Sequence, residues 1–328
     1  MEDAYSDDQL ILTARLYFIE GLPQAQIGKL VNVSQSKISR MLALARQRGL
    51  VRVTVPEYEP RNLALEHQLR ERLNIASLVI RAAAGSRAKD LRQVMGYFAA
   101  PIVSAWIRSG SRVAVSGGRT MQSLIESMKP SGRVHGVTVL QAMGNIDSSP
   151  GPYDAVELCR RLAKAAGGTF LTLNTPAILP DAETCRRLLG LEQIRTVMSG
   201  LAKSDIALVG IGTLENSVFV ERKALGAREI ETLRRAGAAG EILGRFYDAQ
   251  GRECASPLRD RVVSLGLEEL RRIPNVVAVV SGADRRDAIL AAIRGGLVKA
   301  LVIDEGGATA VLDGAGSGGG IDPGTATA

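Results

Sequence analysis

Several residue types that define specialised classes of protein are scarce in this sequence. Aromatic residues make up 4% of the 328 residues, so a core must consist mainly of Ala, Val, Leu and Ile. The three cysteines, Cys159, Cys185 and Cys254, are far apart and form no CxxC pair, which argues against a zinc site. We expect buried or idle thiols in a reducing compartment, and neither a metal nor a cofactor.

Long apolar runs and a secretion signal are also lacking. No apolar run approaches the roughly 20 residues of a membrane-spanning helix. The opening segment, MEDAYSDDQ, is acidic, whereas a signal peptide begins with positive charge. We therefore expect a bacterial-type cytoplasmic protein with no membrane partner. Hydrophobic residues still make up 46% of the chain, an ordinary content for a globular protein with buried strands.

Acidic residues are missing from one interval near the N-terminus. Between Glu20 and Glu57 there is no Asp or Glu. The net charge of the chain is +7, which favours polyanionic partners only mildly, so this local bias is more informative. The basic residues of the interval are Lys29, Lys37, Arg40, Arg46, Arg48 and Arg52.

The same region carries the signals of three short helices. Apolar residues recur at helical spacing over residues 10–19, and a second helix is expected over residues 24–30. Ser34 is a good N-cap for a third helix that ends at Gly49. Residues 50–55 then alternate apolar and polar side chains, as a half-exposed strand does. The second and third helices are expected to bury Ile27, Leu30, Ile38, Leu42 and Ala45.

Three helices followed by a strand predict a winged helix-turn-helix domain over residues 1–56. The start of the third helix would then face DNA bases, through Gln35, Ser36, Lys37 and Arg40. The alternative is a basic surface helix that is simply solvated, but the acid-free interval favours DNA. The residues expected to contact phosphates are Ser34, Ser39, Arg46, Arg48 and Arg52.

A linker helix is expected between this domain and the rest of the chain, within residues 57–74. Leu65, Leu69 and Leu73 recur every four residues, and Glu66 can pair with Arg70. The apolar stripe has two possible roles, which the sequence does not separate. It could contact a second copy of the chain, or it could pack on the domain that follows.

Residues 75–312 alternate short apolar runs with helical stretches. This order predicts an α/β domain with a doubly wound parallel sheet. The Gly-rich segment 313–328 has almost nothing to bury, so we expect it to be disordered. Strands are expected at 78–80, 112–116, 137–141, 170–173, 206–210, 276–280 and 300–303, and helices at 121–128, 153–166, 182–189, 228–236 and 285–294.

Residues 112–128, RVAVSGGRTMQSLIESM, run from a strand through a Gly-Gly turn into a helix. Gly117 and Gly118 would let the backbone wrap an anion, while Arg119 and Thr120 would add a cation and a hydroxyl. In open α/β sheets, ligands bind at the carboxyl ends of strands, where this turn lies. The alternative is a tight turn with no ligand.

Other segments of the second domain could complete such a site. Gly212 belongs to a second turn after a strand, and Glu241 follows a small, flexible segment and could bond sugar hydroxyls. Arg222 and Arg285 could each bind a phosphate bidentately. The alternatives are a helix cap or surface charge for Glu241 and solvated surface positions for the two arginines.

Six segments in this order resemble the SorC-type family of sugar-binding transcriptional regulators over residues 8 to about 312. They are LYFIEGLPQAQIGKL with VSQSKISRMLALARQRGLV, AVSGGRT, SDIALVGIG, GAAGEILGRFYDAQGRE and VVAVVSGADRRDAILAAIRGGLVKALVIDE. The resemblance implies a winged helix-turn-helix joined to a Rossmann-like effector domain, similar to sugar-phosphate isomerases and CoA transferases. It also implies a homo-oligomer, a dimer or tetramer, that binds a DNA operator and a sugar or phosphosugar effector.

The resemblance also assigns roles to individual residues. It places Gly117 to Thr120 in the family's phosphate loop and Gln141 on the strand whose end faces the ligand. It places Arg222 and Glu241 where the effector is contacted. Two positions depart from the family pattern: Arg285 stands where Lys is common, and Pro23 where Ser or Thr is usual.

An enzyme, similar to a phosphosugar isomerase, is the main alternative function. Such an enzyme needs a placed acid or base, and the two histidines, His67 and His135, lie away from the expected ligand loops. An architectural DNA-binding protein is a further alternative, against which the large second domain argues. We therefore expect a non-enzymatic, effector-controlled regulator of carbohydrate genes.

Overall fold

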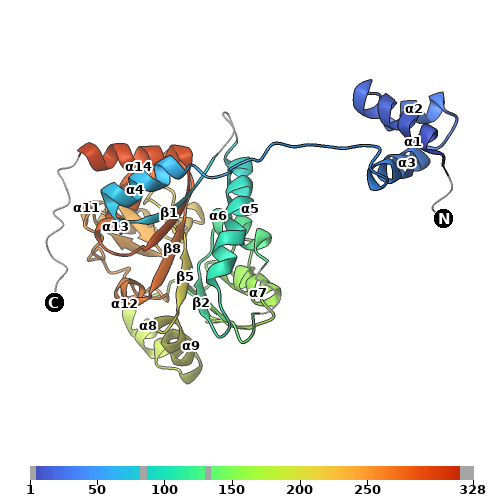
Figure 1. Cartoon of the computed structure of the whole chain (residues 1–328). Coiled ribbons are helices and arrows are strands. Elements are labelled where there is room, and N and C mark those ends of the chain that lie inside the picture. The colour runs from blue at the N-terminus through green and yellow to red at the C-terminus, as the bar shows by residue number, and fades with distance from the viewer. Residues whose placement is uncertain (1–4, 82–86, 130–133, 318–328) are drawn as a thin grey trace. The chain divides into compact units, whose positions relative to one another are not determined.

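The computed structural model describes residues 5–81, 87–129 and 134–317 of the chain. The chain forms two compact units, Met1–Tyr58 and Glu59–Ala328. Each unit has its own core, and each is described by itself below. Figure 1 shows the helices and strands of both units along the chain.

The first unit consists of short helices around a small apolar core (Figure 1). Helix α1 (Asp7–Ala14) continues into a π-helical turn, η1 (Arg15–Ile19), and is followed by α2 (Gln24–Leu30) and α3 (Gln35–Gln47). The three predicted helices are therefore confirmed. Their buried core residues are Leu10, Ala14, Ile27, Ile38, Met41, Leu42 and Ala45.

A tight turn joins α2 to α3. An added Cβ at Gly28 would lie 2.7 Å from the carbonyl oxygen of Val33, so only glycine lets the two helices approach this closely. Asn32 takes the left-handed conformation that the turn requires, with φ 54°. Ser34 caps α3 as predicted, because its hydroxyl accepts the backbone N–H of Lys37. These contacts form a helix-turn-helix.

The expected wing strand over residues 50–55 was a wrong prediction. Residues 52–60 have no regular secondary structure, and Val53 and Val55 are 63% and 78% exposed. A strand needs a partner for its backbone hydrogen bonds, and residues 5–58 provide only helices. Leu30 was also expected to be buried, but it is 63% exposed because it ends α2 on the side away from the core.

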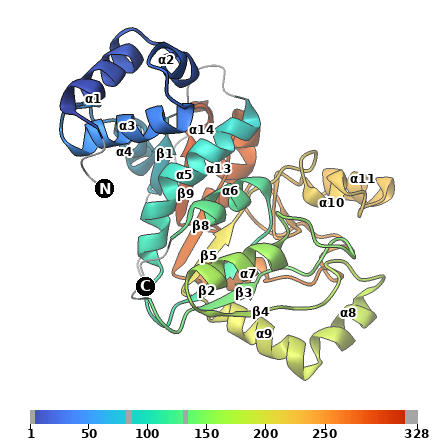
Figure 2. The same ribbon diagram turned by 90° about the vertical axis from the view of Figure 1, so that its right-hand side faces the viewer.

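The second unit is built on one sheet of seven parallel strands in the order β1-β9-β8-β5-β2-β3-β4 (Figure 2). All seven predicted strands are confirmed. Their order in space differs from their order in the sequence, as in a doubly wound fold. The bounds are β1 Ala76–Ile80, β2 Arg112–Val115, β3 Thr138–Gln141, β4 Thr169–Leu171, β5 Ile206–Val209, β8 Asn275–Val279 and β9 Ala300–Asp304.

Helices cover both faces of this sheet (Figure 2). A separate antiparallel hairpin is formed by β6 (Gly240–Ile242) and β7 (Arg245–Tyr247). The helices are α4 Leu63–Leu73, α5 Ala88–Trp106, α6 Arg119–Ser127, α7 Ala155–Ala165, α8 Ala182–Leu189, α9 Glu192–Ala202, α10 Val218–Glu221, α11 Ala227–Arg235, α12 Leu267–Arg272, η2 Ala283–Arg285, α13 Arg286–Arg294 and α14 Glu305–Ser317.

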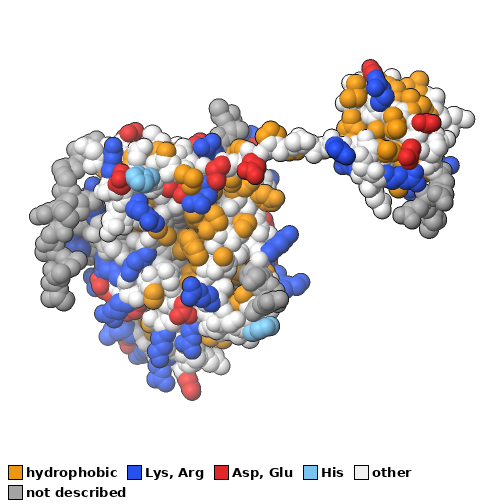
Figure 3. Space-filling view, viewed as in Figure 1, with side chains coloured by type: hydrophobic (Ala, Val, Ile, Leu, Met, Phe, Trp, Pro, Cys, Tyr) orange, Lys and Arg blue, Asp and Glu red, His pale blue; other side chains and the backbone are white. Residues whose placement is uncertain are grey.

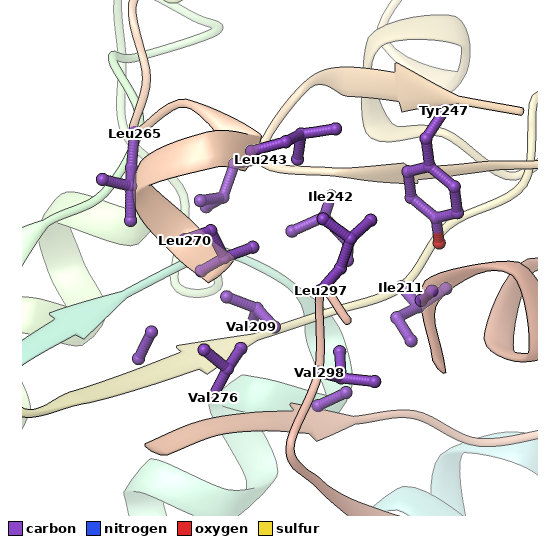
Figure 4. Close-up of a cluster of buried hydrophobic side chains, with 14 of the residues drawn as sticks. Val209, Ile211, Ile242, Leu243, Tyr247, Leu265, Leu270, Val276, Leu297 and Val298 are labelled. Carbon is purple, nitrogen blue, oxygen red and sulfur yellow. The ribbon is translucent and has the colours of Figure 1, made fainter. Parts of the chain in front are cut away.

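Alternate residues of each buried strand belong to different cores. Along β5, Ile206 and Leu208 pack with α5, α6 and α7, whereas Ala207 and Val209 pack in the larger cluster on the other face. Figure 4 shows part of this larger cluster, where Val209 lies near Val276 and Leu297. Aliphatic side chains dominate both cores, as the low aromatic content predicts.

Helix α4 packs on the second unit itself. Leu69 is fully buried and Leu73 is 7% exposed, and both belong to the main core of this unit. Of the two possible roles of the apolar stripe, the structure therefore shows packing on the following domain. The expected pair between Glu66 and Arg70 is not the one formed. Glu66 instead accepts hydrogen bonds from Arg61 at 2.9 Å and from the backbone N–H of Val79 at 3.0 Å, because it faces β1.

The C-terminal helix extends further than the sequence indicated. Helix α14 includes residues 313–317, which were expected to be disordered. Gly314 lies so close to α13 that an added Cβ would be 2.7 Å from Cδ of Arg286, and Ala315 packs against the core. Small residues thus let the end of α14 approach α13. The expectation for residues 318–328 lies outside the described residues.

The packing of α4 can be tested with a pair of leucine variants. Leu69→Ala should lower the free energy of unfolding of the second unit by about 2–5 kcal/mol, because it leaves a cavity in the core. Leu63→Ala, at a position 52% exposed on the same helix, should have a much smaller effect. Chemical denaturation at two protein concentrations measures both. Equal effects, or an Leu69→Ala effect that depends on concentration, would contradict packing within one chain.

Candidate functional site

The exposed face of α3 carries the side chains predicted to bind DNA. Gln35, Ser36, Lys37, Ser39 and Arg40 are all exposed, as is the cap Ser34. The buried face of the same helix holds it against α1 and α2 through residues such as Ile38 and Leu42. One face of α3 thus anchors the helix and leaves its polar start accessible.

The basic residues further along α3 differ in their contacts. Arg48 donates to the carboxylate of Asp7 at 2.8 Å and to the carbonyl of Tyr5, so it ties α3 to the start of α1. The guanidinium of Arg46 lies 5.3 Å from the centre of the Phe18 ring. Arg52 is exposed in the segment after α3. Of these three, Arg48 has a structural role that the sequence did not indicate.

A shallow hollow lies beside the start of α3. Lys29, from the end of α2, lines it together with Gln35 and Lys37. Lys29 was part of the acid-free interval but was not among the residues predicted to bind DNA. The structure therefore adds a cation to the surface around the helix start.

The second unit contains a cavity of about 370 Å³ at the carboxyl ends of β2, β3, β5 and β8. This is the edge of a parallel sheet where ligands are expected. Most of the residues predicted to contact an effector line the cavity together, although they come from distant parts of the sequence. They are Gly117, Gly118, Arg119, Thr120, Gly212, Glu241 and Arg285.

The Gly-Gly turn after β2 is required by its neighbours and by its conformation. An added Cβ at Gly117 would lie 3.0 Å from the carbonyl oxygen of Tyr153. Gly118 has φ 131°, which side-chain-bearing residues rarely adopt, and it serves as the N-cap of α6. The first residues of α6 line the cavity, so the N–H groups that have no partner within the helix lie at its wall.

Polar contacts join the loops around the cavity. Arg119 forms an ion pair with Glu221 at 2.7 Å. The hydroxyl oxygens of Thr120 and Ser281 are 3.5 Å apart. Arg285 donates to the carbonyl oxygen of Ser281 at 2.8 Å and pairs with Asp284 at 2.9 Å. The residues from β2–α6 and from β8–η2 thus meet at one side of the cavity.

Glu241 is a buried carboxyl group in the cavity wall. It is 7% exposed, and its carboxylate accepts a hydrogen bond from the backbone N–H of Gly244. Burial raises the pKa of Glu241 to about 7, although hydrogen bonds from Gly244 and Ser217 oppose the rise. The group can therefore accept or donate a hydrogen bond near neutral pH. An added Cβ at Gly212 would lie 2.8 Å from Oε2 of Glu241, so a side chain at position 212 would crowd this carboxyl group.

Two of the residues predicted to contact the effector do not line the cavity. Gln141 is fully buried, where it donates to Asn145 at 2.8 Å and accepts the backbone N–H of Leu173 at 3.1 Å. Arg222 pairs with Asp154 at 2.5 Å and lies over the ring of Tyr153. Asn145, Asp154 and Tyr153 do line the cavity. The structure thus places Gln141 and Arg222 behind its wall.

The sequence reasoning also missed residues of the cavity. Arg92, from α5, lines it although α5 follows a different strand from the glycine turn. Asn216 donates to Asp284 at 2.9 Å and so joins two loops of the rim. Neither residue belongs to a recognisable motif. Only their position in the folded chain brings them to the site.

The cysteine and histidine side chains in the described part of the chain lie outside the cavity. Among the described residues, no group of three or more His, Cys, Asp or Glu residues is arranged to hold a metal ion. The three cysteines are buried free thiols. Neither histidine lines the cavity, and His67 lies 3.3 Å from Glu71 on the surface. No helix in the described part of the chain is long and apolar enough to cross a membrane.

Comparisons with known proteins agree with this architecture. A family described as "Putative sugar-binding domain" matches residues 60–313. The transcriptional regulator YjhU of Escherichia coli K12 is 27% identical over 94% of this chain and 95% of its own length. The deoxyribonucleoside regulator of Bacillus subtilis is 26% identical over 92% of this chain and 96% of its own length.

A solved structure is similar over nearly the whole chain. The full-length sorbitol operon regulator SorC from Klebsiella pneumoniae has a TM-score of 0.75 with 24% identity, and covers 94% of this chain and 99% of its own. This likeness supports the fold of both units. Because the family match spans well over half of the residues, the chain belongs to the SorC-type sugar-binding family.

The pKa of Glu241 gives a prediction for stability. The folded state keeps its proton up to about pH 7, whereas the unfolded carboxyl loses it near 4.5. Stability should therefore fall as the pH rises from about 4.5 to 7, by up to about 3 kcal/mol. Glu241→Gln should remove most of this fall, and Glu215→Gln, at an exposed position, should not. Denaturation at pH 5 and pH 8 measures it. Identical pH dependence in wild type and Glu241→Gln would contradict a raised pKa.

Proposed function

We propose that this chain is a transcriptional regulator that binds an operator through α3 and whose DNA binding is controlled by a sugar or phosphosugar in the cavity. The observation that carries the proposal is the combination of the two units. One presents a basic helix-turn-helix, and the other holds a cavity with an anion-compatible loop at strand ends. The named relatives are transcriptional regulators, which supports the same conclusion.

The composition of the cavity favours a phosphorylated sugar. The helix start, Thr120 and nearby arginines suit a phosphate group. Glu241 and Asn145 offer hydrogen-bonding groups for sugar hydroxyls. The effector would act by binding two arrangements of the protein with different affinity, since equal affinity would change nothing.

A homo-oligomer, either a dimer or a tetramer, belongs to the proposal. One α3 reads one half-site, so a palindromic operator needs two copies of the chain. The second unit has exposed apolar surface that supports association. Tyr97 on α5 is 67% exposed beside Val94 and Phe98, and Figure 3 shows hydrophobic side chains gathered on that face.

A specific observation also favours a second candidate, an isomerase-like enzyme acting on a phosphosugar. Glu241 combines burial in the cavity with a pKa near 7, which suits a general base. A base of this kind exchanges a carbon-bound proton of a sugar phosphate with solvent. Incubation in D₂O followed by NMR detects that exchange. Exchange that Glu241→Gln abolishes would favour the enzyme, and its absence across a sugar-phosphate panel would exclude this chemistry for those sugars.

The division of labour between the units can be tested by substitution. Arg40→Ala should weaken specific DNA binding about tenfold, because it removes a contact with a base or phosphate. Thr120→Ala should weaken sugar-phosphate binding and leave DNA affinity unchanged. DNA binding is measured by fluorescence anisotropy with the region upstream of the protein's own gene. Effector binding is measured by calorimetry with a panel of sugar phosphates.

Each variant has a matched control. Arg15→Ala removes an exposed arginine of the first unit that lies outside α3, and it should reduce specific DNA binding less than Arg40→Ala does. Thr196→Ala removes an exposed threonine that does not line the cavity. If Arg40→Ala or Thr120→Ala abolished both DNA binding and effector binding in a folded protein, this would contradict separate sites for DNA and effector. If no specific DNA binding were found, the regulator function would fail.

A further inference from the structure

Three arginines line the effector cavity, and they differ in their partners. Arg119 is paired with Glu221, and Arg285 with Asp284. The guanidinium of Arg92 forms no hydrogen bond or ion pair with any residue of the described parts of the chain. It is half-buried, so water satisfies its guanidinium less fully than that of a surface arginine. Its charge is therefore the one in this wall that has no carboxylate partner from the described residues.

The crossing of α5 and α6 brings Arg92 to the phosphate loop. An added Cβ at Gly96 would lie 2.3 Å from the carbonyl oxygen of Ser123, so the two helices touch at this point. Both helices connect parallel strands, so they run in the same direction, and Figure 2 shows them side by side. Arg92 precedes Gly96 by one helical turn, and Arg119 precedes Ser123 by one turn. The two arginines therefore lie at corresponding levels beside the crossing.

The electrostatics agree with this geometry. Burial lowers the pKa of Arg92, and the positive charges of Arg119 and Arg285 lower it further. The two like charges are thus close enough to act on Arg92. Because Glu221 and Asp284 balance the other two arginines, Arg92 leaves one uncompensated positive charge at this wall, which an anion would neutralise.

We propose that Arg92 completes an anion subsite with Arg119 and Arg285 that binds the phosphate group of a sugar-phosphate effector. The inference rests on the proposed function, because it concerns the cavity assigned there to the effector. Arg92 supplies the contact that is not already committed to an internal carboxylate. To contact the anion, Arg119 must release Glu221 or bind both groups at once, and the same holds for Arg285 and Asp284.

The ligand chemistry that fits is a phosphate monoester. A phosphate carries about −1.5 to −2 charge and three acceptor oxygens at neutral pH. Those oxygens match the guanidinium of Arg92, the hydroxyl of Thr120 and the first N–H groups of α6. A carboxylate has two oxygens and one charge, so it would leave part of this set unsatisfied. Inorganic phosphate and a sugar acid distinguish the two chemistries.

The experiment measures ligand affinity of the full chain by calorimetry. The ligands are inorganic phosphate, a panel of sugar phosphates, the matching unphosphorylated sugars and sugar acids. Arg92→Gln should weaken binding of phosphate and of the sugar phosphate about tenfold to a hundredfold, as loss of a charged hydrogen bond does. Arg92→Lys should weaken binding less than Arg92→Gln does, because lysine keeps the positive charge but lacks the paired N–H donors of a guanidinium. Lys89→Gln, an exposed cation on the same helix outside the cavity, should change nothing.

The outcomes separate this subsite from the function of the protein. Loss of phosphate affinity in Arg92→Gln, with DNA affinity and circular dichroism unchanged, supports the subsite. If wild type and Arg92→Gln bind the sugar phosphate equally and both respond to it on DNA, the Arg92 subsite is overturned and effector control stands. Tighter binding of sugar acids than of sugar phosphates by the wild type overturns the phosphate assignment. If the wild type binds no phosphate ligand but an unphosphorylated sugar binds and alters its DNA affinity, the anion subsite is overturned and effector control stands.

Discussion

Parallel pairing of the seven strands is the constraint on which the rest of the second unit depends. It brings the carboxyl ends of β2, β5 and β8 to one edge of the sheet, so loops from distant parts of the sequence meet there. The hydroxyl of Ser116 after β2 accepts the backbone N–H of Gly210 after β5 at 3.1 Å. Gly117 allows the close approach of residues 153–155. The cavity exists because these loops pack so closely.

The charges around the cavity suggest how a ligand could alter the protein. Ion pairs and hydrogen bonds join its loops, for example Arg119 to Glu221 and Asn216 to Asp284. An anion that binds Arg119 competes with Glu221 and so changes a contact between α6 and α10. Such a change shifts an equilibrium only if the two arrangements differ in affinity for the ligand. The rim of the cavity is therefore the place where ligand binding and conformation can be linked.

The sequence predicted the periodic features well and the tertiary contacts poorly. The cap at Ser34, the buried face of α3 and the seven strands follow from local patterns, because hydrophobic periodicity and capping are local. The strand over residues 50–55 failed, since alternation cannot show whether a partner strand exists. Arg92 was missed because its place depends on the contact between Gly96 and Ser123. Gln141 was predicted to contact the ligand. Its side chain instead donates to Asn145 and accepts the backbone N–H of Leu173, just after β4.

We propose that this chain couples a sugar-phosphate site to a DNA-binding helix. Coupling between two binding equilibria must be reciprocal. The direct measurement is therefore the affinity for the sugar phosphate with and without saturating operator DNA, beside the affinity for DNA with and without the sugar phosphate. We expect both ratios to be equal and to differ from one, by roughly 5- to 150-fold. Ratios of one for every bound sugar phosphate would contradict coupling between the two sites.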